Sequence, residues 1–504
     1  MQIKKRLHWG NAIPRAVFVG ISILLQAGWI LLTILVLNES VPWIGGLTRL
    51  ISVGMVLYLN SRHINAAYKM PWIMLIIAMP VMGLSLYLLL VIFGDLGSIG
   101  KRMQKVRSRT RACLPDSGAP EMPGIGVYLQ GQLSCPAYGG TETRYFSEAR
   151  DALETLKADL EQAETFIFME YFIVSGDSAF QEIGEILIRK ARQGVDVRFM
   201  YDDVGSVGYV NMLFAKGLSD AGIHCMVFNP ALPVLNLFMN HRDHRKITVI
   251  DGKVGYTGGY NLSDEYFGRK KVYGHWKDTG IRMEGEAVRS LTAAFLETWN
   301  ACTRTEEPVE PYLSIRHSVT GATGFVQPYE DNPLGRERVA ENVYLNLCYQ
   351  AKKTLYVMTP YLIITDEMTN ALGMAAKRGV DVRIITPGIP DKKTVYAVTR
   401  SYYAGLAEQG VRIFEYAPGF CHAKQMLCDG RIASIGTSNL DYRSLYLHFE
   451  NNVLLYETPA VRQMAADFEE LFPQCEEVTA RYRDGRTKAL RTGQYILRLF
   501  APML

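Results

Sequence analysis

The sequence predicts an α/β protein in which two homologous halves pack as a pseudo-dimer around one shared site, preceded by an N-terminal transmembrane helical anchor. Three observations predict this architecture. Strand-like and helix-like segments alternate after residue 141, one pattern recurs 178 to 189 residues later, and two long uncharged stretches precede both copies. Alternating strands and helices are typical of layered α/β domains with a largely parallel sheet. A chain of 504 residues is also longer than one ordinary domain.

Residues 1–111 are predicted to form the membrane anchor. The stretches 16–37 and 71–93 hold 22 and 23 residues without a charged side chain, and about 20 apolar residues suffice to cross a bilayer as a helix. A third apolar stretch, 41–59, contains one arginine, so the number of spans, two or three, stays open. With two spans, the basic flanks lie on the same side, which the positive-inside rule assigns to the cytoplasm. We therefore expect a multi-pass anchor and a cytoplasmic C-terminal region.

Composition divides the rest of the chain into four parts. Residues 112–140 are rich in Pro, Gly and Ser without a clear period and are predicted to be a linker. The two homologous halves are assigned to residues 141–315 and 316–475. The tail, residues 476–504, mixes basic residues with a late apolar cluster. This pattern fits an interfacial segment on anionic lipid or a helix docked on the domain.

Each half contains the same succession of a buried strand, a helix that ends at a glycine, and a second strand. In the first half the strands are TFIFMEYFI at 165–173 and VDVRFMYDD at 195–203. In the second half they are TLYVMTPYLI at 354–363 and VDVRIITPG at 380–388. The segments RQGVDVRFM and KRGVDVRII align residue by residue. The chain therefore contains two copies of one unit.

Charge and cysteine content disfavour several classes of partner and cofactor. The net charge of +4 gives no reason to expect nucleic-acid binding. The eight cysteines show no C-x-x-C spacing and no companion histidines, so we expect a reduced compartment and no structural zinc. The chain also lacks a G-x-x-x-x-G-K-[ST] nucleotide loop and an H-E-x-x-H zinc helix. We therefore predict a protein without a metal or another cofactor.

Each half ends in the same set of polar residues at the same spacing. A histidine is followed by a lysine two positions later, an aspartate after five more and an asparagine after a further ten. The residues are His244, Lys246, Asp251 and Asn261 in the first half and His422, Lys424, Asp429 and Asn439 in the second. One chance match at such offsets is a roughly 1-in-10,000 event. Two matches, one in each repeat, therefore indicate a functional site.

Strand geometry predicts how these residues meet. The segments KITVID and KQMLCD have strand character, and side chains two positions apart project to the same face of a strand. Each lysine is therefore expected beside its histidine in one pocket. Asp251-Gly252 and Asp429-Gly430 are hairpin turn signals that return each asparagine toward its own histidine. We expect each aspartate to shape the turn and orient the lysine rather than to act as a general base.

Paired sets of imidazole, ammonium and amide groups suit the transfer of a phosphodiester. Lysine and asparagine side chains supply positive charge and N–H donors to the nonbridging oxygens, where charge gathers during phosphoryl transfer. One histidine can attack phosphorus while the other protonates the leaving oxygen and then takes a proton from the incoming hydroxyl. A single half could not do both, so the two histidines are predicted to flank one phosphorus atom.

The two motifs resemble those of the phospholipase D superfamily, and further segments are similar to bacterial cardiolipin synthases. These segments are NHRDHRKITVIDG, YTGGYNLSDEY, HWKDT, TPYLIITDEM, and GFCHAKQMLCDG followed by IGTSNLDYRS and HFEN. The resemblance covers about residues 135–475 and extends to the apolar N-terminal region. One position departs from the family pattern: the serine that often follows the motif glycine is Gly259 in the first half and Thr437 in the second.

The resemblance implies an enzyme of the bacterial plasma membrane that condenses two phosphatidylglycerol molecules into cardiolipin and glycerol, through a phosphatidyl-histidine and without a cofactor. It implies that His244 and His422 act as nucleophile and acid/base. His244 is favoured as the nucleophile, although the two motifs are nearly symmetric. The residues implied to hold the phosphate are Lys246, Lys424, Asn261 and Asn439, and those implied to orient the histidines are Asp278 and Glu450.

Four other functions stay open at this point. Transfer to water would make the chain a hydrolytic phospholipase D, and transfer to serine would make it a phosphatidylserine synthase. A nuclease is disfavoured by the long apolar stretches, and a non-enzymatic membrane scaffold by the intact motifs in both halves. The sequence does not indicate an oligomeric state.

Overall fold

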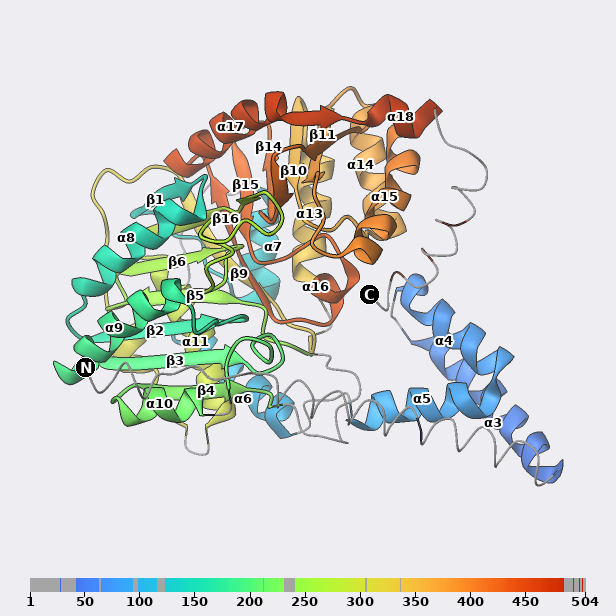
Figure 1. Cartoon of the computed structure of the whole chain (residues 1–504), viewed down its shortest axis with the longest axis horizontal. Coiled ribbons are helices and arrows are strands. Elements are labelled where there is room, and N and C mark those ends of the chain that lie inside the picture. The colour runs from blue at the N-terminus through green and yellow to red at the C-terminus, as the bar shows by residue number, and fades with distance from the viewer. Residues whose placement is uncertain are drawn as a thin grey trace.

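The computed structural model describes residues 28, 42–62, 65–93, 98–115, 123–211, 213–230, 241–303, 306–335, 337–484, 493, 498 and 501. Its body consists of two α/β halves that lie side by side, and the N-terminal helices α3 to α5 project beyond it (Figure 1). Each half is organised around one large sheet. The prediction of two α/β halves is confirmed.

The first half contains a seven-stranded sheet in the order β1-β8-β6-β5-β2-β3-β4. Its strands are β1 (Thr141–Phe146), β2 (Phe166–Tyr171), β3 (Asp196–Asp202), β4 (His224–Phe228), β5 (Lys246–Ile250), β6 (Val254–Gly258) and β8 (Gly280–Gly285). Strands β2, β3 and β4 are parallel, and the remaining pairs are antiparallel. The connecting helices are α8 (Ala149–Glu161), α9 (Ser178–Arg192) and α10 (Phe214–Asp220).

The second half repeats this plan in an eight-stranded sheet of order β17-β12-β11-β10-β14-β15-β16-β9. Its strands are β9 (Phe325–Asp331), β10 (Thr354–Met358), β11 (Asp381–Pro387), β12 (Arg412–Tyr416), β14 (Gln425–Cys428), β15 (Ile432–Gly436), β16 (Glu450–Tyr456) and β17 (Cys475–Glu477). Strands β10, β11 and β12 are parallel. Its helices are α13 (Val339–Gln350), α14 (Asp366–Lys377), α15 (Lys393–Glu408), α16 (Tyr442–Tyr446), α17 (Pro459–Leu471), the 3-10 turn η1 (Phe472–Gln474) and α18 (Thr479–Asp484).

The sheets are mixed rather than largely parallel, which corrects the sequence-based expectation. In each half the motif strand forms a hairpin with the next strand, β5 with β6 and β14 with β15. The turn residues Asp251 and Asp429 have φ angles of 53° and 52°, and the glycines that follow them have 65° and 62°. Two successive residues with positive φ make the tight turn that joins antiparallel strands. The predicted Asp-Gly hairpins are therefore confirmed, and they explain why the sheets are mixed.

Helix α11 (Val288–Cys302) lies in a hydrophobic cluster where the two halves meet. Every residue from Val288 to Ala301 is buried, as expected for a helix that is covered on all sides. Phe295 stacks on Phe168 of β2 with 4.7 Å between ring centroids. The same core cluster contains Val453 and Leu455 of β16. The two halves therefore share a hydrophobic cluster where they meet, in addition to the core of each half.

A short two-stranded sheet also crosses between the halves. Strand β7 (His275–Lys277) of the first half pairs in parallel with β13 (Gly419–Cys421) of the second. Residue 419 must be glycine, because a Cβ atom there would lie 2.2 Å from the carbonyl oxygen of His275. Asp278 follows β7 and His422 follows β13, so this pairing brings an acid of one half beside the motif histidine of the other.

The predicted span 71–93 is not one helix. It divides at Met79 between α4 (Ala66–Ala78) and α5 (Pro80–Phe93), because Pro80 has no amide hydrogen with which to continue α4. A Cβ atom at Gly83 would lie 2.6 Å from the Cα of Ile76, so α5 starts in close backbone contact with α4. The stretch 71–93 is therefore a helix pair.

The other predicted spans have different outcomes. Helix α3 (Pro42–Ser61) covers the candidate span 41–59. Within the described ranges, no helix combines the length and the apolar character that a membrane crossing requires. The predicted span 16–37 lies outside the described residues, apart from Gly28.

Parts of the predicted anchor, linker and tail belong to the body. Helix α6 (Ser98–Ala112) contacts α11, and α7 (Gly124–Leu133) lies inside the predicted linker 112–140. Ile125 and Leu129 of α7 are fully buried in the core of the second half. In the predicted tail, α18 contacts α15. Helices α7 and α18 have only 10 and 6 residues, and α6 carries few apolar residues, so none of them gives a clear periodic signal in the sequence.

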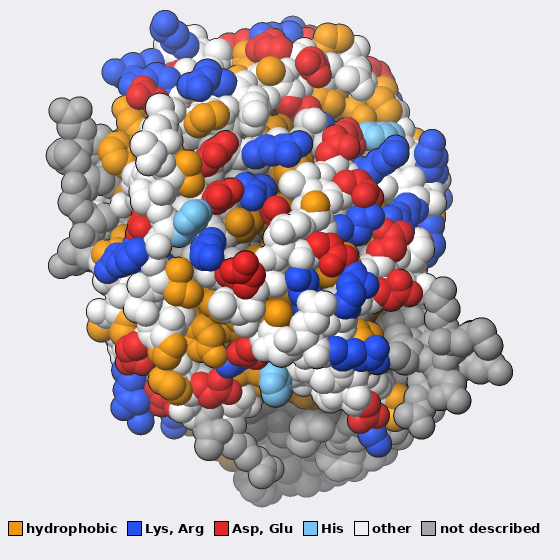
Figure 2. All heavy atoms as spheres, turned by 90° about the vertical axis from the view of Figure 1, so that its left-hand side faces the viewer, with side chains coloured by type: hydrophobic (Ala, Val, Ile, Leu, Met, Phe, Trp, Pro, Cys, Tyr) orange, Lys and Arg blue, Asp and Glu red, His pale blue; other side chains and the backbone are white. Residues whose placement is uncertain are grey.

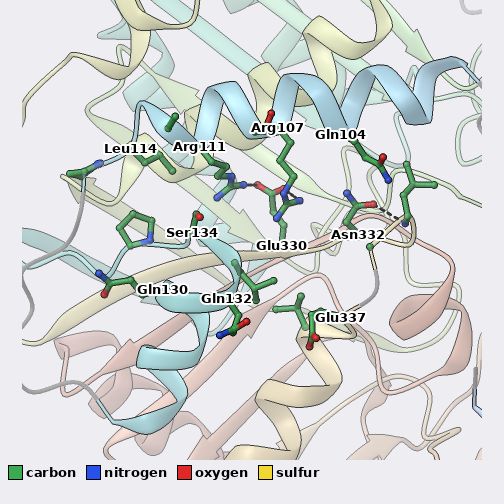
Figure 3. Close-up of a pocket in the computed structure, with 18 residues that line it drawn as sticks. Gln104, Arg107, Arg111, Leu114, Gln130, Gln132, Ser134, Glu330, Asn332 and Glu337 are labelled. Carbon is green, nitrogen blue, oxygen red and sulfur yellow. Dashed lines mark hydrogen bonds and ion pairs between the residues drawn. The ribbon is translucent and has the colours of Figure 1, made fainter. Parts of the chain in front are cut away.

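A buried ion-pair network fixes α6 to the body. Arg111 donates from Nε to Glu297 of α11 and from Nη2 to Glu330 of β9, both at 2.6 Å. All three side chains are less than a tenth exposed. Arg107, one turn earlier, points toward Glu330, and its Nη1 lies 3.6 Å from Oε2 of that carboxylate (Figure 3). The network therefore ties one helix to elements of both halves.

Arg111→Leu is expected to destabilise the protein by about 3–5 kcal/mol, because it leaves two buried carboxylates without their main partner. Arg109→Leu on the same helix should cost less than about 1 kcal/mol, because Arg109 and Glu306 form an exposed pair. Thermal unfolding of the detergent-solubilised variants, followed by circular dichroism, measures the difference. Equal unfolding midpoints would show that the network does not stabilise the fold.

Candidate active site

The two motif histidines line one cavity. His244 lies two residues before β5, His422 lies three residues before β14, and both line a cavity of about 490 Å³ together with Asn261 and Asn439. Each histidine side chain is 9% exposed. Each ring is therefore enclosed by protein and open only to the cavity. The fold brings the histidines of separate halves to one place, as a shared phosphate site requires.

Each histidine is held by a carboxylate from the opposite half. Nδ1 of His244 lies 2.9 Å from both carboxylate oxygens of Glu450, the first residue of β16. Nδ1 of His422 lies 2.7 Å from Oδ2 of Asp278. A carboxylate that accepts the Nδ1 proton fixes the ring and leaves the Nε2 lone pair available for chemistry. The two predicted acids therefore contact the histidines, and each pairing crosses between the halves.

The residue after the motif glycine, Gly259 in the first half and Thr437 in the second, contacts the carboxylate of each histidine–carboxylate pair. A Cβ atom at Gly259 would lie 2.1 Å from Oδ1 of Asp278, so only glycine fits there. In the second half, the hydroxyl of Thr437 donates to Glu450, as does the hydroxyl of Ser444. The hydroxyl that a serine would supply at this position is thus absent from the first half and engaged by a carboxylate in the second.

The motif lysines lie behind the histidines rather than in the cavity wall. Nζ of Lys246 donates to the carbonyl oxygen of His244 at 2.6 Å, and Nζ of Lys424 donates to that of His422. Both lysines are 1% exposed. The prediction that each lysine lies beside its histidine is met, but its ammonium group is buried and acts on the cavity only through its charge. Direct contact with a phosphate would require each ammonium to leave its carbonyl partner.

Asp251 and Asp429 do not contact the lysines, which corrects the lysine-orienting role expected for them. The Asp251 carboxylate accepts hydrogen bonds from the backbone of residues 164–166. Asp429 accepts equivalent bonds from residues 352–354. Each aspartate lies five residues along the strand from its lysine, about 16 Å at the usual rise. Both residues therefore tie the hairpin to the segment before β2 or β10, far from the cavity.

Burial controls the charge of the four central groups. It lowers the pKa of His244 well below the usual value, with a further contribution from the charge of Lys246. Burial lowers the pKa of His422 to about 4. It also lowers the pKa of Lys246 to about 7 and that of Lys424 to about 8. Both imidazoles are therefore neutral at neutral pH, which is the form in which Nε2 can attack phosphorus.

The two orienting carboxylates differ electrostatically. Burial raises the pKa of Glu450 well above its usual value. Burial acts in the same direction on Asp278, but its interaction with the protonated form of His422, its hydrogen bond to that ring and the charge of Lys424 outweigh it and lower the pKa of Asp278. Asp278 is therefore the firmer anion, and it favours a positive charge on His422.

The rate at low substrate concentration is expected to fall as the pH rises through about 7 to 8, because Lys246 and Lys424 lose their protons in this range. A bound phosphodiester anion stabilises the charged lysines, so saturating substrate should move the decline to higher pH. Profiles of kcat/KM and kcat from about pH 5 to about pH 10 measure both effects. Two profiles that stay flat above neutrality would contradict a role for the lysine charges.

Aromatic side chains that the sequence analysis did not identify hold the two imidazoles. Phe172 packs edge-on against His244 with 4.9 Å between ring centroids. Tyr266 and Trp276 pack against His422 at 5.3 and 5.4 Å. These rings restrict rotation of the imidazoles and exclude water around them. Two of them had a signal in the sequence: Trp276 lies in the HWKDT segment beside Asp278, and Tyr266 ends the YTGGYNLSDEY segment.

A third histidine, His448, also lines the cavity and was not predicted. Its ring lies 5.6 Å from that of His244. The signal was its spacing, since it precedes Glu450 by two positions and such residues share one face of an extended chain. His244, His448 and Glu450 each offer a metal-ligand atom within 4.8 Å of the others. A cation held there would compete with the hydrogen bond that orients His244, so the set does not favour a catalytic metal.

Comparison with known proteins decides the family. The family described as "Cardiolipin synthase, PLD-like domain" matches residues 156–299 and 344–472, one match in each half. The cardiolipin synthase of a Geobacillus species is 34% identical over 92% of this chain and 94% of its own length. That of Alkalihalophilus pseudofirmus is 37% identical over 83% of this chain and 85% of its own. This chain belongs to the cardiolipin synthase family. The resemblance inferred from the motifs is therefore confirmed.

Two further proteins are similar to this member of the cardiolipin synthase family, one in sequence and one in fold. A Streptococcus mutans protein described as uncharacterized is 39% identical over 90% of this chain and 100% of its own length. The phosphatidylserine synthase of Haemophilus influenzae superposes with a TM-score of 0.55 at 15% identity, over 76% of this chain and 100% of that structure. At this identity the likeness shows a shared fold of two α/β halves and does not bear on the substrate.

Proposed function

We propose that this chain is a phosphatidyltransferase that joins two phosphatidylglycerol molecules into cardiolipin and glycerol. One observation carries the proposal: His244 and His422 line the same cavity, and each is held at Nδ1 by a carboxylate of the opposite half. This arrangement offers one imidazole as the nucleophile and the other as the acid and base for one phosphodiester. The relatives named above are cardiolipin synthases, which supports cardiolipin as the product.

The reaction proceeds in two half-reactions. In the first, Nε2 of the neutral His244 attacks the phosphorus and the P–O bond to the glycerol headgroup breaks. His422, which takes up a proton beside Asp278 and the bound phosphodiester anion, gives that proton to the departing oxygen. In the second, His422 takes the proton of a primary hydroxyl on the acceptor lipid, whose oxygen attacks the phosphorus as the P–N bond breaks. The anionic Asp278 stabilises the imidazolium form of His422, which supports the acid/base role for this histidine. One phosphodiester replaces another, so no external energy source is required.

Four side chains are proposed to bind the phosphate. Asn261 and Asn439 line the cavity. Oδ1 of Asn261 accepts a hydrogen bond from the backbone N–H of Ile173 at 3.0 Å, so the amide nitrogen, which also interacts with Tyr266, supplies the N–H donors of this side chain. Lys246 and Lys424 supply positive charge from behind the histidines. In a site shielded from water, these donors stabilise the charge that develops on the nonbridging oxygens.

We infer further that the N-terminal region holds the enzyme on a bacterial plasma membrane as a multi-pass anchor, with the catalytic body on the cytoplasmic side. Apolar side chains of α3 and α4 are strongly exposed, among them Leu50 at 71%, Leu57 at 65% and Ile77 at 64%. An apolar surface of this kind is typical of one covered by lipid or protein. Alkaline carbonate extraction of cell membranes should leave the chain in the pellet, whereas release into the supernatant would contradict the anchor.

The proposed partners are phosphatidylglycerol and other membrane lipids, without nucleic acid or a metal. Basic and acidic side chains are intermixed over the face of the first half shown in Figure 2, rather than gathered in a strip of one sign. A basic strip is what nucleic-acid binding requires. We expect turnover to be unchanged by a chelator of divalent cations.

The purified full chain in detergent, supplied with phosphatidylglycerol alone, tests the proposed function. We expect cardiolipin and glycerol in equal amounts. Phosphatidic acid as the sole product would identify a hydrolytic phospholipase D, and a requirement for serine would identify a phosphatidylserine synthase. An absence of turnover would favour a membrane scaffold.

A further inference from the structure

The third imidazole of the cavity has no role in the chemistry described above. The side chain of His448 is 11% exposed, and among the described residues its Nε2 atom has no hydrogen-bond partner. Its Nδ1 lies 3.9 Å from Glu450, beyond hydrogen-bond distance. A buried nitrogen without a partner is unfavourable. Because Nε2 is buried, a ligand in the cavity reaches it only when the ring turns, and a hydrogen bond accepted from His448 would then remove this deficit.

Cationic groups surround this imidazole. Arg242 and Arg443 line the cavity with His448. After burial, the charges of Arg443, Arg242 and Lys246 are the main factors that lower the pKa of His448 well below its usual value. Arg242 is held in place, because its Nη2 donates to the carbonyl of Asn229 at 2.6 Å. A neutral imidazole with an N–H donor thus lies in a positive field, which favours an anionic ligand.

Two acidic side chains of the same cavity are engaged by other groups. Asp391 accepts a hydrogen bond from the hydroxyl of Tyr361 at 2.6 Å. Asp441 accepts one from the backbone N–H of Ser444 at 2.8 Å. Neither is among the main charges acting on His448. Glu265 also lines the cavity, and Asp202 lies 3.4 Å from Nε of Arg242. Neither of these acids is among the main charges acting on His448, which are those of Arg443, Arg242 and Lys246.

We propose that His448, Arg242 and Arg443 form a subsite that binds the phosphodiester anion of the acceptor lipid. This inference rests on the proposed function, in which the acceptor is a second phosphatidylglycerol and carries a phosphate of its own. The attacking hydroxyl of that lipid is separated from its phosphate by one glycerol unit. The 5.6 Å between the rings of His244 and His448 is comparable with this span.

The subsite explains how the enzyme selects its acceptor. As the acceptor hydroxyl oxygen bonds to phosphorus, the P–N bond to His244 breaks and the proton passes to His422, while the acceptor phosphate stays at His448. Water and neutral alcohols lack this second anchor. They gain nothing from His448, so a charged lipid is favoured over them at the transfer step.

Competition between two acceptors in one reaction tests the subsite. The full chain is given phosphatidylglycerol together with isotopically labelled glycerol, and the ratio of cardiolipin to labelled phosphatidylglycerol is measured. His448→Leu is expected to lower this ratio about tenfold, the typical loss for one hydrogen bond to an anion. His448→Gln keeps an N–H donor near the position of Nε2 and should restore most of the ratio. Because both products come from the same active molecules, partial misfolding does not change the ratio.

A control variant shows whether the change in product ratio is specific to His448, and inorganic phosphate shows whether an anion binds at His448 or at the catalytic histidines. His224→Leu, an exposed histidine of β4 outside the cavity, should keep the wild-type ratio. Inorganic phosphate should suppress cardiolipin more than glycerol exchange in the wild type, but not in His448→Leu. Equal suppression of both products would place phosphate at the catalytic histidines and would overturn the subsite.

The same experiment distinguishes failure of the subsite from failure of the proposed function. If the wild type exchanges glycerol but makes no cardiolipin, the proposed function is wrong. If the wild type makes cardiolipin and His448→Leu shows the same product ratio, the function stands and the subsite is wrong.

Discussion

Replacing either motif histidine with alanine, His244→Ala or His422→Ala, is expected to lower cardiolipin synthesis at least about a thousandfold. The reason is the shared cavity: each imidazole performs a step that the other cannot perform at the same time. The loss should appear in kcat, while binding of phosphatidylglycerol to the cavity is largely kept. Product formation in detergent micelles measures the effect, with His224→Ala as the control. Substantial activity in either single variant would contradict the shared site.

An activated substrate shows which histidine forms the covalent intermediate. A phosphatidyl ester with a p-nitrophenol leaving group does not need a proton from the enzyme, so loss of the acid should leave release of nitrophenol largely intact. If His244 is the nucleophile, His422→Ala will release nitrophenol from this substrate and His244→Ala will not. The reverse pattern would exchange the two roles and leave the shared site intact.

The orienting carboxylates give the second large effect. Asp278→Asn and Glu450→Gln are each expected to lower kcat by about a hundredfold to ten-thousandfold with little change in KM. An amide keeps the size of the side chain but can donate to Nδ1, which places the imidazole proton on Nε2 and removes the lone pair needed for chemistry. Turnover of phosphatidylglycerol by the two variants measures this loss.

Because each carboxylate orients the histidine of the opposite half, the two carboxylate variants should affect different steps of the reaction. Glu450 belongs to the second half but orients His244, so Glu450→Gln should slow nitrophenol release if His244 is the nucleophile, whereas Asp278→Asn should largely spare it. Glu415→Gln removes a buried carboxylate that binds Arg400 outside the cavity, and it controls for the loss of a buried charge. Equal rates for Glu450→Gln and the control would show that the hydrogen bond does not orient the ring.

Local signals predicted the parts of the fold that short stretches of chain determine. The repeated strand segments, the two Asp-Gly hairpins and the spacing of the motif residues are all visible in a few consecutive residues. The helix pair at 71–93 was predicted as one span, because apolar composition outweighed the interruption by Pro80. Helix α7 was predicted as linker, because its ten residues carry little more than Ile125 and Leu129 as a core face.

The sequence by itself determined which side chains supply the site, because a strand places a histidine beside the lysine two positions later and a hairpin returns the asparagine. Only the tertiary structure decided that Glu450 holds His244, that Asp278 holds His422, and that His448 joins them. These contacts link residues 144 to 206 positions apart in the chain. They depend on how α11, β7 and β13 join the two halves, and packing between halves leaves no periodic pattern within either one.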